Sequence, residues 1–294
     1  MRIIILGSNG QVGKSLRRIL DEEDAIFLTK QECDLESVSD IQNIFDIYRP
    51  ELIINCAAYT NVDAAESDVK ICNLINNDAV RNIAILSEKN KTFLIHLSTD
   101  YVFDGNSKRP YLESDHVNPL GVYARSKLQS EQEIIKSKCK SIIIRTSWVF
   151  SEFGNNFLKT MLKISKNKKK INVINDQHGC PTYALDIAYA IQIITHEIAK
   201  NKNIGGIYHF SGNESCTWFQ FAKEIFKHSK QYNLNNPELI PISSNEYKTK
   251  ALRPMYSILN CNKIKNEFDI NSSDWKKGVR EVIYNLSLKD GNPN

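Results

Sequence analysis

The chain has 294 residues, of which 41% are hydrophobic and 24% charged, and its formal net charge is +4. These values are ordinary for a globular protein, and the lysines are scattered, so nothing indicates a nucleic-acid-binding surface. No stretch approaches the ~18 continuous apolar residues of a membrane span. The seven cysteines are odd in number and form no CxxC pair. We therefore expect a cytoplasmic protein with reduced thiols, without a signal peptide, a disulfide framework or a zinc site.

The first 150 residues alternate between apolar runs that suit buried strands and amphipathic stretches that suit helices. The expected strands are 2–6, 25–29, 51–55, 92–97 and 141–146. The expected helices are 11–21, 37–48, 69–88 and 121–138. This alternation predicts an α/β fold with a Rossmann-type doubly wound parallel sheet.

The pattern changes after Phe150. The expected helices are then 155–168, 183–199, 215–230 and 275–288, with extended segments at 171–175 and 206–210. We expect residues 1–150 to form a dinucleotide-binding domain, to which the segment around 183–200 returns. Residues 151–294 should form mainly a smaller substrate-binding domain that caps the cofactor edge.

A glycine-rich turn follows the first apolar run, Ile3–Leu6, and precedes the first expected helix. Strand, glycine turn and helix are the context of a dinucleotide fingerprint, although the spacing here is GxxGxxG and not GxGxxG. Glycines allow a tight turn, close approach of the pyrophosphate and close packing of helix on strand. The helix N-terminus then faces the phosphates with free N–H groups. The predicted cofactor-binding residues of this turn are Gly7, Gly10, Gln11, Val12 and Gly13.

The end of the second strand carries Thr29 and Lys30. An NAD-preferring site usually has a carboxylate there, about 20 residues after the glycines, which hydrogen-bonds the ribose hydroxyls. Without that carboxylate nothing repels a 2′-phosphate, and Lys30 can attract one, so we expect NADPH to be preferred and NADH to be possible. The alternative for Lys30 is an ordinary solvated lysine. Asp34, which precedes Leu35, either bonds the adenine amino group or caps the next helix.

Two further strand ends belong to the same predicted edge of the sheet. The small residues after the third strand let a cofactor lie against the backbone; the predicted contacts are Ala57, Ala58, Tyr59 and Thr60. The fourth strand runs into Thr99 and Asp100. Ligands of a doubly wound sheet sit at the carboxyl ends of the strands, so the Thr99 hydroxyl could donate to a substrate carbonyl. The alternative is that Thr99 and Asp100 only form a turn.

Tyr123 and Lys127 stand four residues apart in an expected helix. This spacing puts a phenol and an ammonium on one helix face, where the charge should lower the tyrosine pKa and favour proton transfer. An amphipathic helix with a half-buried tyrosine would show the same spacing. The glycine turn at the start of the chain favours the catalytic interpretation, in which Tyr123 is the general acid.

Several segments are recognisable when they are taken together. They are Gly7–Gly13, Asn55–Asp63 with Glu66, STDYVFDG at 98–105, Tyr123–Lys127, RTSWVF at 145–150, GNNF at 154–157, DQHGCPT at 176–182, GIYHFSG at 206–212 and Arg253-Pro254. Over nearly the whole chain they resemble the extended short-chain dehydrogenase/reductases, and within them the dTDP-4-dehydrorhamnose reductase family. The resemblance implies NAD(P)H-dependent reduction of a dTDP-linked 4-keto-6-deoxy sugar. It also implies that Thr99, Tyr123 and Lys127 are catalytic and that Lys127 bonds the nicotinamide ribose.

The same resemblance suggests substrate contacts. Asp100 would bond a sugar hydroxyl, and Asn156 and Arg253 would bind the nucleotide end, Arg253 through the bidentate fit of its guanidinium to phosphate. Trp148 has two interpretations, an apolar wall for the sugar's C6 methyl face or an aromatic residue of the core.

Two departures from the family pattern matter. Ser15 and Leu185 stand where members with a magnesium-bridged dimer carry glutamates, so magnesium is in doubt, no metal ligand is assigned, and we expect a monomer or weak homodimer. Asp100-Tyr101 follows Thr99 where dehydratases of the superfamily have Asp-Glu, which favours simple ketone reduction. The alternatives are a reductase of another nucleotide-linked 4-ketohexose and a catalytically silent nucleotide-binding regulatory subunit. The presence of Thr99, Tyr123 and Lys127 argues against the silent subunit.

Overall fold

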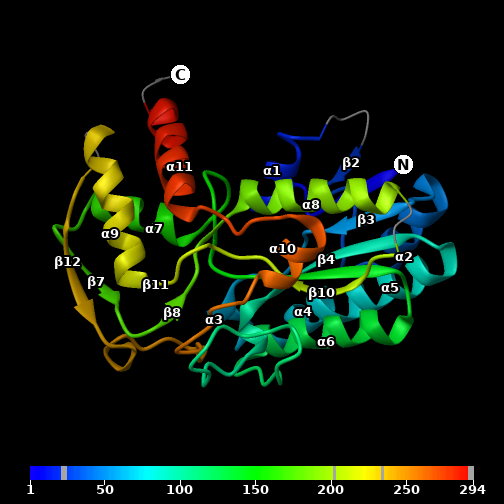
Figure 1. Cartoon of the computed structure of the whole chain (residues 1–294), viewed down its shortest axis with the longest axis horizontal. Coiled ribbons are helices and arrows are strands. Elements are labelled where there is room, and N and C mark those ends of the chain that lie inside the picture. The colour runs from blue at the N-terminus through cyan, green and yellow to red at the C-terminus, as the bar shows by residue number, and fades with distance from the viewer. Residues whose placement is uncertain (21–24, 201–202, 233–234, 291–294) are drawn as a thin grey trace.

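The computed structural model describes residues 1–20, 25–200, 203–232 and 235–290. Its central feature is a parallel sheet of six strands in the order β10-β5-β4-β3-β1-β2 (Figure 1). The strands are β1 (Ile3–Leu6), β2 (Ala25–Leu28), β3 (Leu52–Asn55), β4 (Phe93–Thr99), β5 (Ser141–Thr146) and β10 (Gly206–His209). Strands that are covered on both faces read as continuous apolar runs, as β1 and β3 do. The predicted fold class is confirmed.

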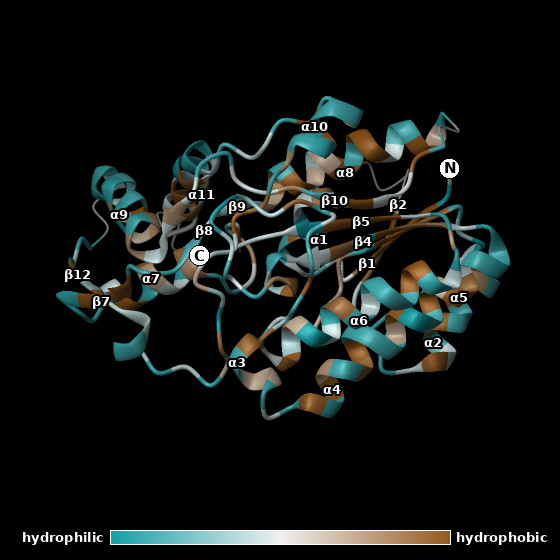
Figure 2. Cartoon of the chain, turned by 60° about the horizontal axis from the view of Figure 1, so that its bottom comes forward, coloured by the Kyte–Doolittle hydropathy of each residue, from teal (hydrophilic) through white to brown (hydrophobic). Residues whose placement is uncertain are grey.

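Helices cover both faces of this sheet, which is the apolar middle layer in Figure 2. On one face pack α1 (Gln11–Leu16), α8 (Ala184–Ala199) and α10 (Asn262–Phe268). On the other pack α2 (Val38–Asn43), α5 (Ala79–Asn90) and α6 (Val122–Ser137). Helix α8 comes after Phe150 in the chain, yet its apolar face shares one core with β1 and α1. None of the helices in the described ranges has the length and apolar character that crossing a membrane requires.

A second group of elements lies beside the carboxyl ends of the strands, to the left in Figure 1. Its helices are α7 (Phe157–Ser165), α9 (Trp218–Ser229) and α11 (Trp275–Asp290). Beside them, β7 (Lys170–Ile174) pairs in parallel with β12 (Glu238–Ile242). Two short pairs complete the group: β6 (Val149–Phe150) with β9 (Thr182–Tyr183), and β8 (His178–Gly179) with β11 (Cys216–Thr217). Phe221 is at the centre of this group's own core.

The structure differs from the expected elements in several places. Helix α1 ends at Leu16, after which the N–H groups of Arg18 and Ile19 bond three residues back, in a tighter turn. The expected end at Asp21 lies outside the described residues. The stretch 37–48 is α2 followed by a π-helix (Ile44–Tyr48). The stretch 69–88 divides into α4 (Val69–Asn73), a π-helix (Leu74–Asp78) and α5. Helix α10 was not expected, since it is too short to show a clear period.

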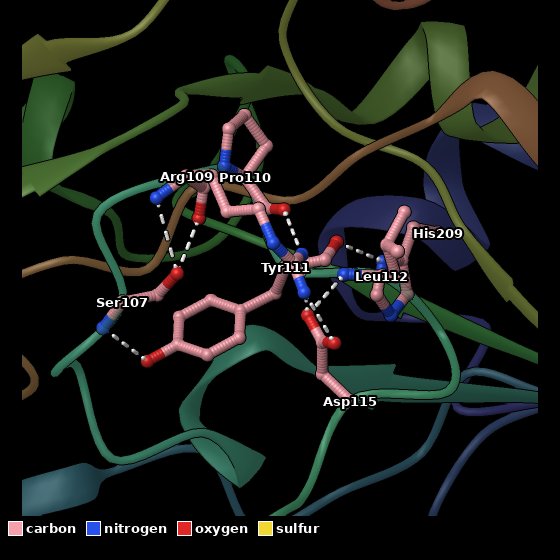
Figure 3. Close-up of polar contacts among 7 residues, drawn as sticks. All are labelled: Ser107, Arg109, Pro110, Tyr111, Leu112, Asp115 and His209. Atoms are coloured by element: carbon pink, nitrogen blue, oxygen red, sulfur yellow. Dashed lines mark hydrogen bonds and ion pairs between the residues drawn. The ribbon is translucent and has the colours of Figure 1, made fainter.

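The long connection between β4 and α6 is an ordered loop (Figure 3). Asp115 accepts from both terminal nitrogens of Arg109, at 2.8 and 2.9 Å, and from the N–H of Leu112 at 2.8 Å. The carbonyl of Tyr111 lies 3.1 Å from Nδ1 of His209 on β10. The loop is therefore closed on itself and tied to the sheet, which fixes the chain between Thr99 and the start of α6.

Candidate active site

A cavity of about 520 Å³ lies at the carboxyl ends of β1 to β4. The predicted cofactor residues that line it are Gly7, Gly10, Gln11, Val12, Lys30, Asp34, Leu35, Ala57, Ala58, Thr60, Tyr123 and Lys127. Sequence reasoning missed further lining residues, which are Leu6, Asn9, Cys33, Cys56, Ile75, Leu97, Ser98, Thr146, Val149, Gly154 and Asn155. Most of these flank a predicted residue in the chain, so the strand-end pattern could have found them.

The glycine turn is shaped for a ligand that lies against the backbone. Gly7 has φ +73°, and a Cβ on it would lie 2.6 Å from the amide nitrogen of Ala57. A Cβ on Gly13 would lie 2.5 Å from the carbonyl oxygen of Gly7. Gly13 is buried beneath the turn and does not line the cavity. The turn can close only with glycine at these two positions, and this fits the cradle that a dinucleotide pyrophosphate needs.

Carboxylates do lie near the end of β2, although the chain has none at the expected position. The carboxylate of Glu32 turns back and accepts from the N–H of Thr29 at 2.8 Å, and this hydrogen bond lowers the pKa of Glu32. Lys30 bonds to Glu36 and lies 3.7 Å from Asp34, and the Glu36 bond raises the pKa of Lys30. A 2′-phosphate would therefore compete with Glu36 for the exposed Lys30 ammonium.

Two predicted cofactor residues have other structural roles. Asp34 does not cap the next helix: Ser37 caps α2, and Asp34 accepts from the N–H of Glu36 at 3.0 Å. The adenine contact of Asp34 stays a prediction. The hydroxyl of Tyr59 donates to Asp68 at 2.7 Å, and Tyr59 does not line the cavity.

The three predicted catalytic side chains come together from β4 and α6. Thr99 ends β4, and its hydroxyl donates to Oδ1 of Asp100 at 3.1 Å and accepts from the N–H of Tyr101 at 3.2 Å. The same hydroxyl lies against the phenol of Tyr123 and favours its ionised form. Lys127, one helical turn beyond Tyr123, lines the same cavity.

The electrostatics of Tyr123 differ from the expectation. Burial raises the pKa of Tyr123, and the contact with Thr99 only partly opposes this. The Lys127 ammonium was expected to lower that pKa, but Nζ of Lys127 lies 3.0 Å from Nε2 of His96 instead. Burial lowers the pKa of Lys127 to about 8, against the attraction of Glu131. The phenol is thus neutral throughout the physiological pH range, as a proton donor must be.

Asp100 is a second unusual titratable group beside Thr99. Its side chain is buried, and burial raises its pKa to about 7. Ser257 lies near enough to oppose the shift, but Oδ2 of Asp100 has no hydrogen-bond partner among the described residues. A protonated Asp100 could donate to Thr99, whereas an ionised Asp100 accepts from it. Whether Asp100 also bonds a sugar hydroxyl stays a prediction.

A buried ion pair fixes α6 on the sheet. Arg145 of β5 bonds Glu131 of α6 through two nitrogens, with Nη2 2.6 Å from Oε2 and Nε 2.9 Å from Oε1. Both side chains are almost completely buried. Ser98 also donates to this carboxylate. Glu131 stands four residues after Lys127 on the same helix face, a spacing that sequence reasoning did not use. The pair holds the register of α6 and with it the positions of Tyr123 and Lys127.

The predicted substrate residues are less closely gathered. Trp148 does not line the cavity; it has φ +46° and stacks on Trp218 with ring centroids 3.4 Å apart. Asn156 caps α7 through Lys159 and donates to Gln11 at 2.9 Å, so these contacts give it a structural role.

Arg253 makes a bidentate pair with Asp63, at 2.7 and 3.2 Å. This pair joins the loop before α10 to helix α3 (Val62–Ala65) of the cofactor-binding half. A phosphate on Arg253 would have to share the guanidinium with Asp63.

The described residues contain no cluster of three or more His, Cys, Asp or Glu side chains suited to a metal. Ser15 is buried and donates to the carbonyl of Gln11 at 3.0 Å, and Leu185 packs at the edge of the second core. Neither position therefore offers a carboxylate to an ion.

Comparisons with known proteins agree with this geometry. The model of the family described as "RmlD substrate binding domain" matches residues 1–288. The dTDP-4-dehydrorhamnose reductase of Aggregatibacter actinomycetemcomitans is 39% identical, over 96% of this chain and 98% of the relative. The enzyme of the same name from Escherichia coli K12 is 35% identical, over 97% and 98%.

Solved structures show the same similarity. A dTDP-4-dehydrorhamnose reductase from Bacillus anthracis in complex with NADP superposes with a TM-score of 0.89 at 36% identity, covering 97% of this chain and 99% of that one. A dTDP-glucose 4,6-dehydratase from Streptomyces venezuelae has a TM-score of 0.79 at 13% identity, covering 99% and 98%, and shares the fold.

Proposed function

Because the chain belongs to the family of dTDP-4-dehydrorhamnose reductases, we propose that it reduces the 4-keto group of dTDP-4-dehydrorhamnose with NADPH. The observation that supports this most directly is that Tyr123, against which the Thr99 hydroxyl lies, and Lys127 line the same cavity as the glycine turn. The Bacillus anthracis relative was solved with NADP. NADPH is the preferred cofactor, and NADH can replace it.

Tyr123 provides the proton in this reaction. Bound NADPH supplies the hydride that reduces the carbonyl carbon. The carbonyl oxygen then needs a proton, and the phenol of Tyr123 gives it as a general acid. Since burial raises the pKa of Tyr123, the phenol holds its proton at neutral pH and releases it only to a stronger base such as the forming alkoxide.

Thr99 stabilises the oxygen on which negative charge develops. Its hydroxyl donates to Asp100 in the structure, so it can turn to the substrate most easily when Asp100 is protonated. The pKa of Asp100, raised to about 7, places this change near neutral pH. Donation to a developing oxyanion is stronger in the transition state than in the ground state, and it is therefore catalytic. Lys127 would hold the nicotinamide ribose.

The proposed function is tested with purified protein, NADPH and dTDP-4-dehydrorhamnose. Tyr123→Phe removes only the phenolic oxygen, and a removed general acid costs on the order of 10²–10⁴-fold in kcat. NADPH affinity, followed by its fluorescence, should change little. Tyr284→Phe is the matched control, because Tyr284 is exposed on α11. Near-parental kcat in Tyr123→Phe, or no reduction of the ketosugar by the parent protein, would contradict the proposal.

The ketosugar nucleotide is the only partner that we propose. The protein acts as a monomer or a weak homodimer, because Ser15 and Leu185 provide no carboxylates for a bridging ion. Light scattering at several protein concentrations tests this part separately from catalysis. A mass that stays dimeric at high dilution would overturn it.

A further inference from the structure

A buried group of polar side chains lies beneath the Lys127 amine. It consists of Asn55 at the end of β3, His96 on β4, and Lys127 and Ser130 on α6. His96 and Ser130 are 0% exposed, Asn55 1% and Lys127 2%. Nζ of Lys127 lies 3.0 Å from Nε2 of His96, and Nδ1 of the same ring lies 3.2 Å from Nδ2 of Asn55. Buried groups of this kind must satisfy one another's hydrogen bonds.

The amide of Asn55 determines which ring nitrogen of His96 carries the proton. The backbone N–H of Ala57 can only donate, and it lies 3.0 Å from the side-chain oxygen of Asn55, so the amide orientation is fixed. The NH2 group of Asn55 therefore faces Nδ1 of His96 as a donor, and Nδ1 must accept. Burial and the nearby Lys127 hold the pKa of His96 well below its usual range, so the ring is neutral. A neutral ring whose Nδ1 accepts carries its proton on Nε2.

The Nε2–H of His96 points at Ser130 and Lys127. Oγ of Ser130 lies 3.2 Å from Nε2, and it donates its own proton to the backbone carbonyl of Lys127 at 2.6 Å. This leaves a lone pair of Ser130 for the imidazole N–H. An ammonium at Lys127 has three donors and no lone pair, so it would meet another donor at Nε2. A neutral amine has a lone pair and can accept from Nε2–H.

We propose that His96, locked by Asn55 with its proton on Nε2, is a positioning residue that directs a hydrogen-bond donor at Lys127 and so favours the neutral form of this amine. This inference rests on the proposed function only in that Lys127 is taken as an active-site group. Lys127 then changes its charge near neutral pH and is not a permanent cation.

The other titratable groups around Lys127 agree with this assignment. Burial lowers the pKa of Lys127 to about 8, and the charge of Glu131 opposes the shift. The Glu131 carboxylate, however, is bonded to Arg145 and Ser98. Cys56, after β3, and Cys72, on α4, also face Lys127, and burial raises the pKa of both thiols, so they are neutral. Among the described residues, His96 is the hydrogen-bond partner recorded for Nζ of Lys127.

The first test reads the tautomer directly and needs no substrate. Long-range ¹H–¹⁵N spectra of protein labelled on its six histidines show which ring nitrogen is protonated, and loss of a signal in His96→Gln assigns it. We expect His96 to carry its proton on Nε2 from pH 5 to 9. A proton on Nδ1, or a ring that becomes cationic near pH 6, overturns the proposal while leaving the reductase assignment untouched.

The second test measures the charge of Lys127 with ¹³C-labelled lysine, assigned by the loss of its signal in Lys127→Met. In Asn55→Asp the carboxylate can accept from both Ala57 and His96, which moves the ring proton of His96 to Nδ1. A lone pair on Nε2 then faces Lys127. We expect the pKa of Lys127 to rise by about one to two units, the size of a hydrogen bond to a charged group. The upper limb of the pH profile of kcat should move with it.

A double-mutant cycle separates the ring from the new carboxylate charge. In a His96→Gln background there is no tautomer to switch, and Asn55→Asp should then shift the pKa of Lys127 by less than half as much. An equal shift in both backgrounds would mean that charge alone acts, and it would overturn the positioning role. If the variants fail to fold, the tautomer of the parent protein still decides the question.

Discussion

Replacing Asp100 by Asn should stabilise the protein in a pH-dependent way. The carboxyl is buried, and its pKa is raised from 3.8 to about 7. A group whose folded pKa lies above its unfolded value binds a proton more tightly in the folded state. The native protein therefore loses stability as the pH rises from 4 to 7, and the penalty is complete above pH 7. Three units at 1.36 kcal/mol each give about 4 kcal/mol as an upper limit.

Asparagine keeps the acceptor that Thr99 uses at Oδ1 and carries no charge at any pH. Its NH2 group takes the place of an oxygen that has no partner, which costs about 1–3 kcal/mol independently of pH. The pH dependence of the difference between parent and variant is therefore the diagnostic quantity, and urea unfolding between pH 4 and pH 8.5 measures it. We expect the free energy of unfolding of Asp100→Asn, relative to that of the parent, to increase by several kcal/mol from pH 4 to pH 8.5.

A matched control has the opposite sign. Asp115 bonds Arg109, and this bond lowers the pKa of Asp115, so its contribution to stability is present above pH 4 and is lost in acid. When the measurements are extended below pH 4, Asp115→Asn should therefore lose stability relative to the parent as the pH rises toward 4, and the difference should stay nearly constant from pH 5 to pH 8.5. If the difference between Asp100→Asn and the parent is the same at pH 4 and at pH 8.5, the carboxyl of Asp100 is not shifted and the reasoning is refuted.

Three other changes have defined outcomes. Glu131→Gln leaves Arg145 as a buried unpaired charge and should lower the free energy of unfolding by about 3–5 kcal/mol in urea. The control Glu238→Gln, in the exposed pair with Lys170, should lower it by at most about 1 kcal/mol. Equal losses would contradict the burial argument. Glu36→Gln removes one of the two carboxylates beside Lys30 and leaves Asp34. The variant should tighten NADPH relative to NADH by up to about fivefold in fluorescence titrations. An unchanged ratio would show that Lys30 does not meet the 2′-phosphate. EDTA should leave kcat unchanged because Ser15 and Leu185 cannot bind magnesium; activity that falls with EDTA and returns with magnesium would show that other residues bind the ion.

The parts of the fold and the site that the sequence predicted depend on local patterns. The strand and glycine turn at Gly7 and the spacing of Tyr123 and Lys127 depend only on near neighbours in the chain, and the structure places all of them around one cavity. The alternation of apolar runs likewise predicted the sheet, because inner strands such as β1 and β3 are buried on both faces.

The remaining features depend on residues far apart in the chain. The Glu131–Arg145 pair and the contact between His96 and Lys127 form only when α6 packs on the sheet. The direction of the Tyr123 pKa could not be read from a spacing, since burial decides it and burial is a tertiary property. The pairing of Lys30 with Glu36 likewise depends on a loop that folds back on the strand end, which the sequence did not show.

Hydride transfer to sugar C4 is tested most directly with NADPH that is deuterated at C4 of the nicotinamide. The parent protein should convert dTDP-4-dehydrorhamnose to a dTDP-6-deoxyhexose that carries one deuterium at C4 of the sugar, seen by NMR and mass spectrometry. The same sample with Tyr123→Phe should give almost no labelled product. Label at another carbon, or NADPH that binds without any reduction of the ketosugar, would contradict the proposed reaction.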